Sequence, residues 1–329
     1  MTGAVLAKLL AMFVTVAIGW VATRRRWLGR PEDGDPARVL GNLAFYLFVP
    51  ALLIRTTVRL DLAHMPWRTL AAFFVPVLAL LLGTYGWNRW RGAAARHGAA
   101  APAVRAITVS FGNSVQVGIP FVAAVYGEAG LAIHIALVSL HALVLLSVLT
   151  ALAESDLART QAGHADPGAL ARTLASTARN TVIHPVVLPV LAGLLWNLTG
   201  LGLHPVVDEG LATLAAAVVP VCLVLIGVTL AAYGLRGSLR SALWLTATKL
   251  LLLPAAVLAV AWLGFGLGGL PLAVVVLMAA LPAGSNAMIF AQRYETLQAE
   301  TTGAIVLSTV GFAATASLWL WLLRLVGAA

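Results

Sequence analysis

Long apolar runs recur along the whole chain, and they constrain its fold more than any other feature. Each run has about 20 residues, which as a helix is enough to cross the ~30 Å hydrocarbon layer of a membrane. Only 10% of the 329 residues are charged and 61% are hydrophobic, which excludes an ordinary soluble domain. The sequence therefore predicts an all-α integral membrane protein, because a helix satisfies its own backbone hydrogen bonds in lipid.

Ten runs have this length, and we expect ten transmembrane helices. They are Ala4–Ala22, Ala37–Ile54, Leu70–Trp87, Val104–Tyr126, Leu131–Ala153, Thr181–Leu198, Leu211–Ala232, Ser241–Leu263, Pro271–Gln292 and Thr302–Leu323. A basic cluster, residues 24–26, follows the first run, and no small-residue cleavage site precedes that cluster. We therefore expect a retained first helix and not a signal peptide.

The distribution of arginine predicts the orientation. If the N-terminus is outside, the inner loops and helix ends hold most of the arginines, and the outer side holds only Arg55, Arg59, Arg68 and Arg324. Positive charge gathers on the inner side of membrane proteins, so both termini are expected outside. The net charge of +9 then reflects this asymmetry and does not indicate a nucleic-acid partner. The single cysteine excludes a disulfide framework and a cysteine-based metal site.

The longest polar connection divides the chain into two halves. Residues 154–180 are predicted to be a cytoplasmic linker between a first five-helix repeat, residues 1–153, and a second, residues 181–329. Because five spans precede the linker, the second repeat is inverted relative to the first, as in many secondary transporters. Pro50 and Pro220, both in Val-Pro-x-x-Leu sequences at the same place in each half, support the pairing and are candidate helix breaks.

Two stretches, one in each half, are unsuited to a plain lipid-facing helix. The first, Ser110–Tyr126, contains Ser110, Gly112, Asn113, Ser114, Gln116, Gly118 and Pro120; the second, Leu281–Ala287, contains Pro282, Gly284, Ser285 and Asn286. Proline removes a backbone donor, and glycine loosens a helix. Interrupted helices in corresponding positions of two halves are typical of a transporter binding site. The fourth and ninth helices are therefore predicted to be broken.

These motifs, together with Tyr46-Leu-Phe-Val-Pro50-Ala-Leu and Phe290-Ala-x-x-Tyr294, resemble the auxin efflux carrier family, within the bile acid, arsenite and riboflavin transporter group. The match spans essentially the whole chain. It implies ten helices in two inverted repeats, a scaffold domain and a core domain, and helices four and nine crossing at their prolines.

The resemblance also implies a substrate and a location. Members of the family move organic anions such as auxin, malate or malonate, and they form homodimers through scaffold helices. Plant members have a long cytoplasmic loop between the halves, whereas the connection here is short. The resemblance therefore indicates a bacterial-type carrier of the inner (plasma) membrane.

Asn113 is the first candidate for substrate binding, because its side chain offers two donors and an acceptor that suit a carboxylate. Alternatively, it only satisfies backbone groups freed by the break. Ser114 and Gln116 are further candidates, although they cannot share its face of a regular helix, so we expect one of them to serve packing. Ser285 and Asn286 follow the second break. Helix N-termini beside such breaks attract anions without any arginine in the membrane.

Ionisable side chains within the spans are candidates for charge or coupling. Lys249 is well inside the eighth span, where an ionisable group is costly. It is expected to supply a fixed positive charge in place of a sodium ion, to titrate because burial disfavours its charged form, or to snorkel to the inner surface. His141 is a candidate for proton coupling, and His134 lies near the outer end of the same span. Tyr46 and Thr229 line the site or make ordinary interhelical bonds.

The sequence as a whole predicts a secondary transporter for a small organic anion, a carboxylate, working by alternating access. The alternative is a non-transporting membrane sensor or assembly protein on a carrier-like fold. No enzyme, catalytic residue, metal or cofactor is expected, because no nucleophile motif accompanies Ser285. Proton coupling, sodium coupling and uncoupled flux stay open as alternatives.

Overall fold

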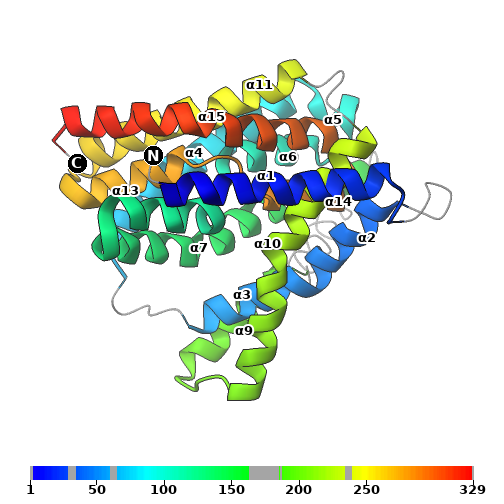
Figure 1. The fold of residues 1–329 in the computed structure, drawn as a ribbon, viewed down its shortest axis with the longest axis horizontal. Helices are drawn as coiled ribbons and strands as arrows, with labels where there is room; N and C mark the ends of the chain where they lie inside the picture. Colours follow the sequence, from blue (N-terminus) through cyan, green and yellow to red (C-terminus); the bar gives the residue numbers. More distant parts are fainter. Residues whose placement is uncertain are drawn as a thin grey trace.

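The protein is all-helical (Figure 1) in a computed structural model that describes residues 3–28, 35–59, 65–162, 185, 187–233 and 239–327. Only the backbone is described for some of these residues, including Gln116, Pro120 and Thr229. An isolated two-residue bridge is the sole strand-like pairing among the described residues. The all-α prediction is confirmed.

The elements in chain order are α1 (Gly3–Arg24), α2 (Pro36–Leu43), η2 (Ala44–Phe48), α3 (Val49–Val58), α4 (Trp67–Trp90), α5 (Ala93–His97), α6 (Ala101–Ser110), η3 (Ser114–Gly118), α7 (Ile119–Ala162), α9 (Val187–Leu198), α10 (Pro205–Tyr233), α11 (Leu239–Ala247), η4 (Thr248–Leu252), α12 (Leu253–Ala259), η5 (Val260–Gly264), α13 (Gly269–Ala280), α14 (Asn286–Arg293) and α15 (Gln298–Leu325). The η elements are single π-helical turns.

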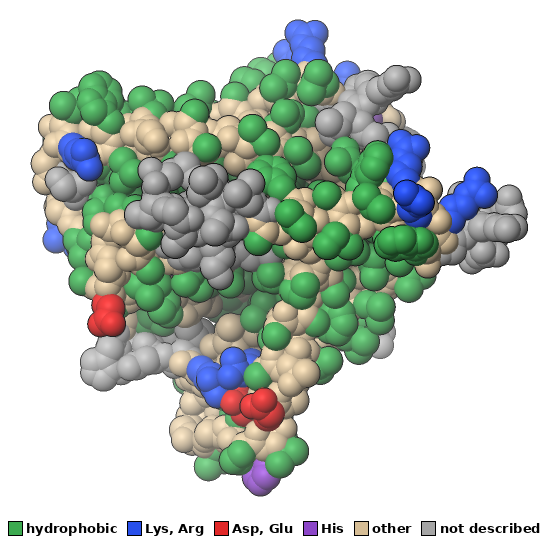
Figure 2. Space-filling view, in the orientation of Figure 1, with side chains coloured by type: hydrophobic (Ala, Val, Ile, Leu, Met, Phe, Trp, Pro, Cys, Tyr) green, Lys and Arg blue, Asp and Glu red, His purple; other side chains and the backbone are tan. Residues whose placement is uncertain are grey.

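Six stretches of described helix are long and apolar enough to span a membrane. They are Pro36–Val58, Trp67–Trp90, Phe121–Thr160, Pro205–Val228, Leu239–Gly264 and Gln298–Leu325. Three shorter apolar helices accompany them: Phe13–Arg24, Leu188–Leu198 and Gly269–Ala280. These six long and three shorter helices among the described residues indicate a multi-pass membrane protein. The count of ten helices in two inverted repeats stays a prediction. In Figure 2, apolar side chains are spread over the whole face, and charged side chains are few: they lie near the outline and in one cluster of both signs on the lower lobe.

Three prolines each follow a π-helical turn. Pro50, Pro120 and Pro254 are the second residues of α3, α7 and α12, directly after η2, η3 and η4. A proline ring clashes with the carbonyl four residues before it, and a wider turn relieves that clash. Pro220 differs, because α10 continues through it as a regular helix. The break predicted at Pro220 is therefore wrong, and the resemblance of the two Val-Pro sequences does not extend to their backbone.

The predicted linker begins later than expected. Helix α7 continues through the first nine residues of the predicted segment 154–180, to Ala162, and residues 163–180 lie outside the described part of the chain. The extension is held by Asp156, which is 5% exposed and accepts a 2.7 Å hydrogen bond from the Tyr85 hydroxyl. Asp156 also pairs with Arg89. A buried carboxylate with these partners stabilises the helix beyond its apolar span.

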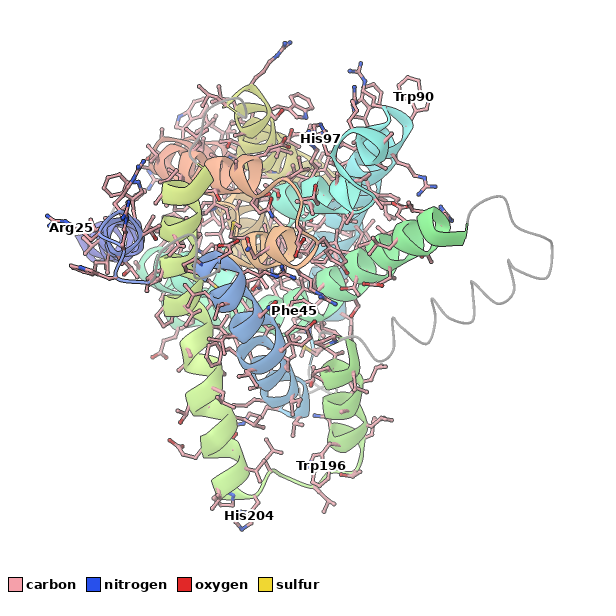
Figure 3. The ribbon with its side chains drawn as sticks, turned by 90° about the vertical axis from the view of Figure 1, so that its right-hand side faces the viewer. Arg25, Phe45, Trp90, His97, Trp196 and His204 are labelled. Carbon is pink, nitrogen blue, oxygen red and sulfur yellow. The ribbon has the colours of Figure 1, made fainter. Side chains whose placement is uncertain are left out.

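The helices pack in two groups, each with members from both halves of the chain. One group contains α1, α2, η2, α3, α9 and α10; the other contains the elements from α4 to α7 and from α11 to α15. In the first, α1 lies along α10, where Cβ atoms on Gly19 and Gly227 would approach Val224 O and Val16 O to 2.3 and 2.0 Å. These glycines permit a close helix contact without side chains between the backbones. Figure 3 shows the far tip of this group, at Trp196 and His204.

Ion pairs join helices at two places. Near the C-terminal end of α4, the Arg105 guanidinium binds both carboxylate oxygens of Glu300, at 2.7 and 2.9 Å, and donates to Asn88 Oδ1 at 2.9 Å. At the C-terminal end of α3, Arg55 and Arg59 both pair with Asp208 in the first turn of α10. Charged contacts therefore lie beyond the apolar middle of the spans.

Candidate functional site

The two interrupted segments meet in the interior of the protein. Helix α6 ends at Ser110 and helix α13 ends at Ala280, and the chain after each adopts a few non-helical residues before a new helix begins. Gly112 and Ala283 form an isolated antiparallel bridge between these two stretches. We call this meeting point, residues 111–114 and 281–286, the crossing.

Backbone hydrogen bonds join the two stretches on both sides of this bridge. The amide of Asn113 donates to Pro282 O and the amide of Gly284 donates to Phe111 O, each at 2.8 Å. The approach needs glycine, since a Cβ on Gly284 would lie only 2.9 Å from Gly112 O. Each break thus satisfies backbone groups that the other leaves free, as an irregular backbone in a membrane requires.

The crossing differs from the expected position in the first segment. It lies at Gly112, whereas Pro120 is the second residue of α7, after the π turn. Gly118 has another role, because a Cβ there would lie 2.6 Å from His134 Nε2. The imidazole approaches at this place and its Nε2–H donates to Ser114 O at 2.8 Å. His134 therefore holds the start of the second half of the segment.

Two cavities adjoin the crossing. The first, of about 270 Å³, is the apolar cavity, lined by Phe13, Val16, Ala17, Trp20, Asn113, Leu223, Ile226, Leu230, Ser285, Ile305, Val306 and Thr309. The second, of about 100 Å³, is the polar cavity; its lining includes Leu52, Leu53, Thr56, Phe111, Gly112, Asn113, Ser114, Ser139, His141, Gly284, Ser285 and Asn286. Asn113 and Ser285 line both. The crossing thus stands between an apolar and a more polar space.

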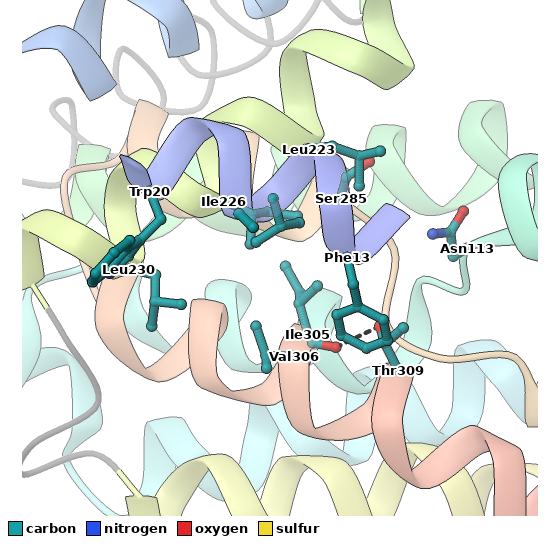
Figure 4. Close-up of a pocket in the computed structure, with 12 residues that line it drawn as sticks. Phe13, Trp20, Asn113, Leu223, Ile226, Leu230, Ser285, Ile305, Val306 and Thr309 are labelled. Carbon is teal, nitrogen blue, oxygen red and sulfur yellow. Dashed lines mark hydrogen bonds between the residues drawn. The ribbon is translucent and has the colours of Figure 1, made fainter. Parts of the chain in front are cut away.

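Figure 4 shows the apolar cavity with Asn113 and Ser285 toward one side and Trp20 at the other. Its walls come from α1, α10 and α15, and the polar side chains in its lining are Asn113, Ser285 and Thr309. The Thr309 hydroxyl donates to Ile305 O at 2.7 Å within its own helix. Among the described residues, no charged side chain lines this cavity.

Most of the predicted binding residues lie at the crossing. Asn113 and Ser114 are 7% and 6% exposed, and Ser285 and Asn286 are partly buried. All four line the polar cavity. The side chain of Gln116 lies outside the described residues, as does that of Thr229.

Tyr46 lies elsewhere. It belongs to the π turn η2, is 45% exposed, and lines a surface groove with Asn42 and Leu47. The Arg293 guanidinium lies 5.4 Å from its ring centre, a cation–π contact between α14 and η2. The expectation that Tyr46 lines the binding site is therefore not met in this structure, because this face of η2 is turned away from both cavities.

Three hydroxyl side chains of the cavities were not anticipated from the sequence. Thr56 and Ser139 line the polar cavity, and Thr309 lines the apolar one. Each donates to the carbonyl four residues before it, at 2.7, 2.8 and 2.7 Å. Such back-bonding is common for hydroxyls in any helix, so the sequence carries no signal that separates these three from the others.

The ionisable candidates lie beside the crossing. Lys249 is 1% exposed and its ammonium donates to Ala279 O at 2.7 Å, so it does not snorkel to a surface. His141 lines the polar cavity, with its ring centre 4.3 Å from that of Phe111. Among the described residues, no cluster of histidine, cysteine or carboxylate side chains is suited to a metal ion.

Two helices begin at the crossing. The η3–α7 helix starts at Ser114, and α14 starts at Asn286. First-turn amides of a helix lack intrahelical acceptors and carry the positive end of its dipole. The backbone amides of Asn113, Ala287 and Met288 are already bonded within the protein, to Pro282 O, Gly284 O and Ser285 O. The donors beside these termini are therefore the side-chain amide of Asn113 and the hydroxyls of Ser114 and Ser285, all in the lining of the polar cavity. The arrangement is suited to an anion.

Comparison with known proteins gives a family and a set of relatives. The family model described as "Membrane transport protein" matches residues 4–320. The chain is 35% identical over 143 residues to "Uncharacterized transporter YfdV" of Escherichia coli K12, an alignment that covers 43% of this chain and 45% of the relative. The same values apply to the proteins of that name from Escherichia coli O157:H7 and Shigella flexneri. The alignment thus spans less than half the length of these relatives.

Proposed function

Because the chain belongs to the membrane transport protein family, which confirms the resemblance noted above, we propose that it is a secondary carrier for a small organic anion. The family is one of transporters and not of enzymes. The proposal places the anion at the crossing and its release on either side of the membrane by alternating access. It includes a bacterial inner-membrane location with both termini outside, and two inverted repeats.

One observation carries the proposal. Asn113 and Ser285, from the two interrupted segments, line both cavities. Each lies within one residue of the start of a new helix, and the positive end of that helix dipole is at this start. Paired half-helix N-termini near the middle of the membrane are where carriers with broken helices hold the anionic groups of their substrates.

The apolar cavity favours one class of anion. We propose a monocarboxylate with an apolar or aromatic body, its carboxylate at Asn113 and Ser285 and its body among Trp20, Ile226 and Val306. A second carboxylate, as in malate or malonate, would enter a space in which no described lining residue is charged. An unpaired ionised group in such surroundings costs several kcal/mol even after relaxation.

The packing of the helices supports alternating access. Both cavities lie on the boundary between the two helix groups: α1, α3 and α10 supply one wall, while the crossing, α7 and α15 supply the other. A rigid movement of one group against the other would change which cavity is open without rebuilding the crossing. Rocking of this kind about a fixed site is the usual mechanism in carriers built from repeats.

The test is uptake into proteoliposomes with labelled indole-3-acetate and labelled malonate as probes. We expect indole-3-acetate to accumulate by a saturable process that Asn113→Ala abolishes. Ile226→Trp, which fills the apolar cavity, should also reduce uptake. Asn42→Ala is the matched control, since Asn42 is exposed on α2 and away from both cavities.

The outcomes separate the parts of the proposal. Uptake of malonate alone, with the same dependence on Asn113, would refute the monocarboxylate class and keep the carrier. Stabilisation of the purified protein by indole-3-acetate without any flux would instead identify a sensor on a carrier-like fold. Uptake that is equal in wild type and Asn113→Ala would refute the site.

A further inference from the structure

We infer that the Lys249 ammonium is a built-in cation of the crossing, occupying the end of α13 where an alkali ion would otherwise be needed, so that the crossing assembles without sodium. The inference extends the proposed function, but it concerns the architecture of the crossing and does not depend on the substrate. It rests on the hydrogen bonds and burial around Lys249 and on the electrostatics of a helix end.

Lys249 lies in the π turn η4, within the stretch Leu239–Gly264 that is long enough to span a membrane. It is among the largest fully buried side chains of the described residues, with 1% of its surface exposed. An ammonium group in the middle of a span is costly. A long side chain that could reach the surface by snorkelling, and does not, is held by something inside.

The acceptor that holds it is created by the break. In a continuous helix, the amide of Ala283 would donate to Ala279 O, four residues before it. Here the Ala283 amide donates to Ser308 Oγ at 3.0 Å, and Ala279 O accepts from Lys249 Nζ at 2.7 Å. The lysine therefore replaces the amide that α13 loses at its C-terminal end.

The ammonium also lies beside the other interrupted segment. A Cβ placed on Gly112 would be 3.5 Å from Lys249 Nζ and 3.5 Å from Met278 O. Helix α6 ends just before Gly112, so the C-terminal ends of α6 and α13 both approach this region. The carbonyl ends of two helices carry partial negative charge, which favours a cation between them.

Carriers with broken helices use such carbonyl ends to coordinate a sodium ion. Among the described residues, no group of three or more histidine, cysteine or carboxylate side chains could hold a metal ion. The Lys249 ammonium, bonded to Ala279 O, supplies positive charge at these helix ends in place of a free cation.

The test uses thermal unfolding of the purified protein in detergent and needs no transport. The variants are Lys249→Ala and Lys249→Met, with Leu253→Ala, a 1% exposed neighbour in α12, as the control for a simple cavity. Each is melted in sodium chloride and in choline chloride of equal ionic strength. Lys249→Ala and Leu253→Ala are also melted with n-propylammonium, which replaces the deleted part of the lysine, or with 1-propanol, its uncharged analogue.

We expect wild type to melt at the same temperature in both salts. Lys249→Ala should melt lower, recover most of the loss with propylammonium but not propanol, and melt higher in sodium than in choline. Lys249→Met should melt lower and respond to neither cation, since its side chain fills the site. Leu253→Ala should melt lower with no response to the amine.

Three results would overturn the inference: sodium dependence of wild type, equal rescue by propylammonium and propanol, or no difference between the salts for Lys249→Ala. If Lys249→Ala does not yield folded protein, its yield when purified with propylammonium is compared with its yield with propanol. Equal yields would then overturn the inference. None of these readouts changes if the substrate is not a carboxylate, so a failure here is distinct from a failure of the proposed function.

Discussion

Gly284→Ala is expected to open the crossing. A Cβ at this position would lie 2.9 Å from Gly112 O, 2.9 Å from Phe111 Cδ1 and 3.1 Å from Gly112 C. Ordinary contacts of carbon atoms lie near 3.5–4.0 Å, so the two stretches must move apart. They cannot move without disturbing the hydrogen bond from the Gly284 amide to Phe111 O.

The cost follows from these contacts. Overpacking of a tight interior costs about 1–3 kcal/mol, and the loss of one hydrogen bond adds about 1 kcal/mol. Replacing glycine by alanine also lowers the conformational entropy of the unfolded chain, which offsets about 0.5–1 kcal/mol of this loss. The net loss is about 1–3.5 kcal/mol. By the entropy scaling of soluble domains, this lowers the melting temperature of a 329-residue chain by roughly 1–5 °C.

The single cysteine of the chain can be used to follow unfolding. Cys222, the single cysteine, is fully buried on α10, so a thiol-reactive fluorophore labels it only as the protein unfolds. The matched control is Gly86→Ala in α4, where a Cβ would meet no atom within 4 Å. That substitution should leave the melting temperature unchanged or raise it slightly. Equal melting of Gly284→Ala and wild type would refute the close antiparallel crossing.

Glu300→Gln should lower stability by about 3–5 kcal/mol, because it leaves the Arg105 guanidinium buried without its carboxylate. Labelling of Cys222 during heating measures this, and Glu209→Gln, on an exposed carboxylate, should show no loss. Burial, reinforced by Glu154, raises the pKa of the Tyr294 hydroxyl above its ordinary value. The folded state then holds this proton more tightly than the unfolded state. The contribution of the protonated Tyr294 hydroxyl to the free energy of unfolding is therefore complete below about pH 10 and is lost as the pH rises above it. Tyr294→Phe should flatten the fall of melting temperature between about pH 9 and 11, and an unchanged slope would contradict the assignment.

The positions of the two interruptions could be read from the sequence because their causes are local. Gly112, Asn113, Pro282 and Gly284 disfavour a helix wherever they occur in an apolar span. The sequence could not give the residues at which the segments cross. The pairing of Gly112 with Ala283, 171 residues later, depends on how the helices pack, and it selected Gly112 in place of the expected Pro120.

The candidate site was likewise predicted in part. Asn113, Ser114, Ser285 and Asn286 lie next to the breaks in sequence, and proximity to a break was enough to find them. Tyr46 was chosen by position in a motif, and the π turn η2 directs it to the surface. Thr56, Ser139 and Thr309 reach the cavities only because distant helices place them there.

By itself the sequence determined that this chain is a multi-pass helical membrane protein with a broken helix in each half. Apolar length and helix-breaking residues act over a few turns, so no tertiary contact is needed to infer them. Only the tertiary structure decided that each break satisfies the other, that two cavities of different polarity share Asn113 and Ser285, and that Lys249 binds the carbonyl freed from α13. Those features depend on hydrogen bonds between groups far apart in the chain, whose partners are set by packing and not by local pattern.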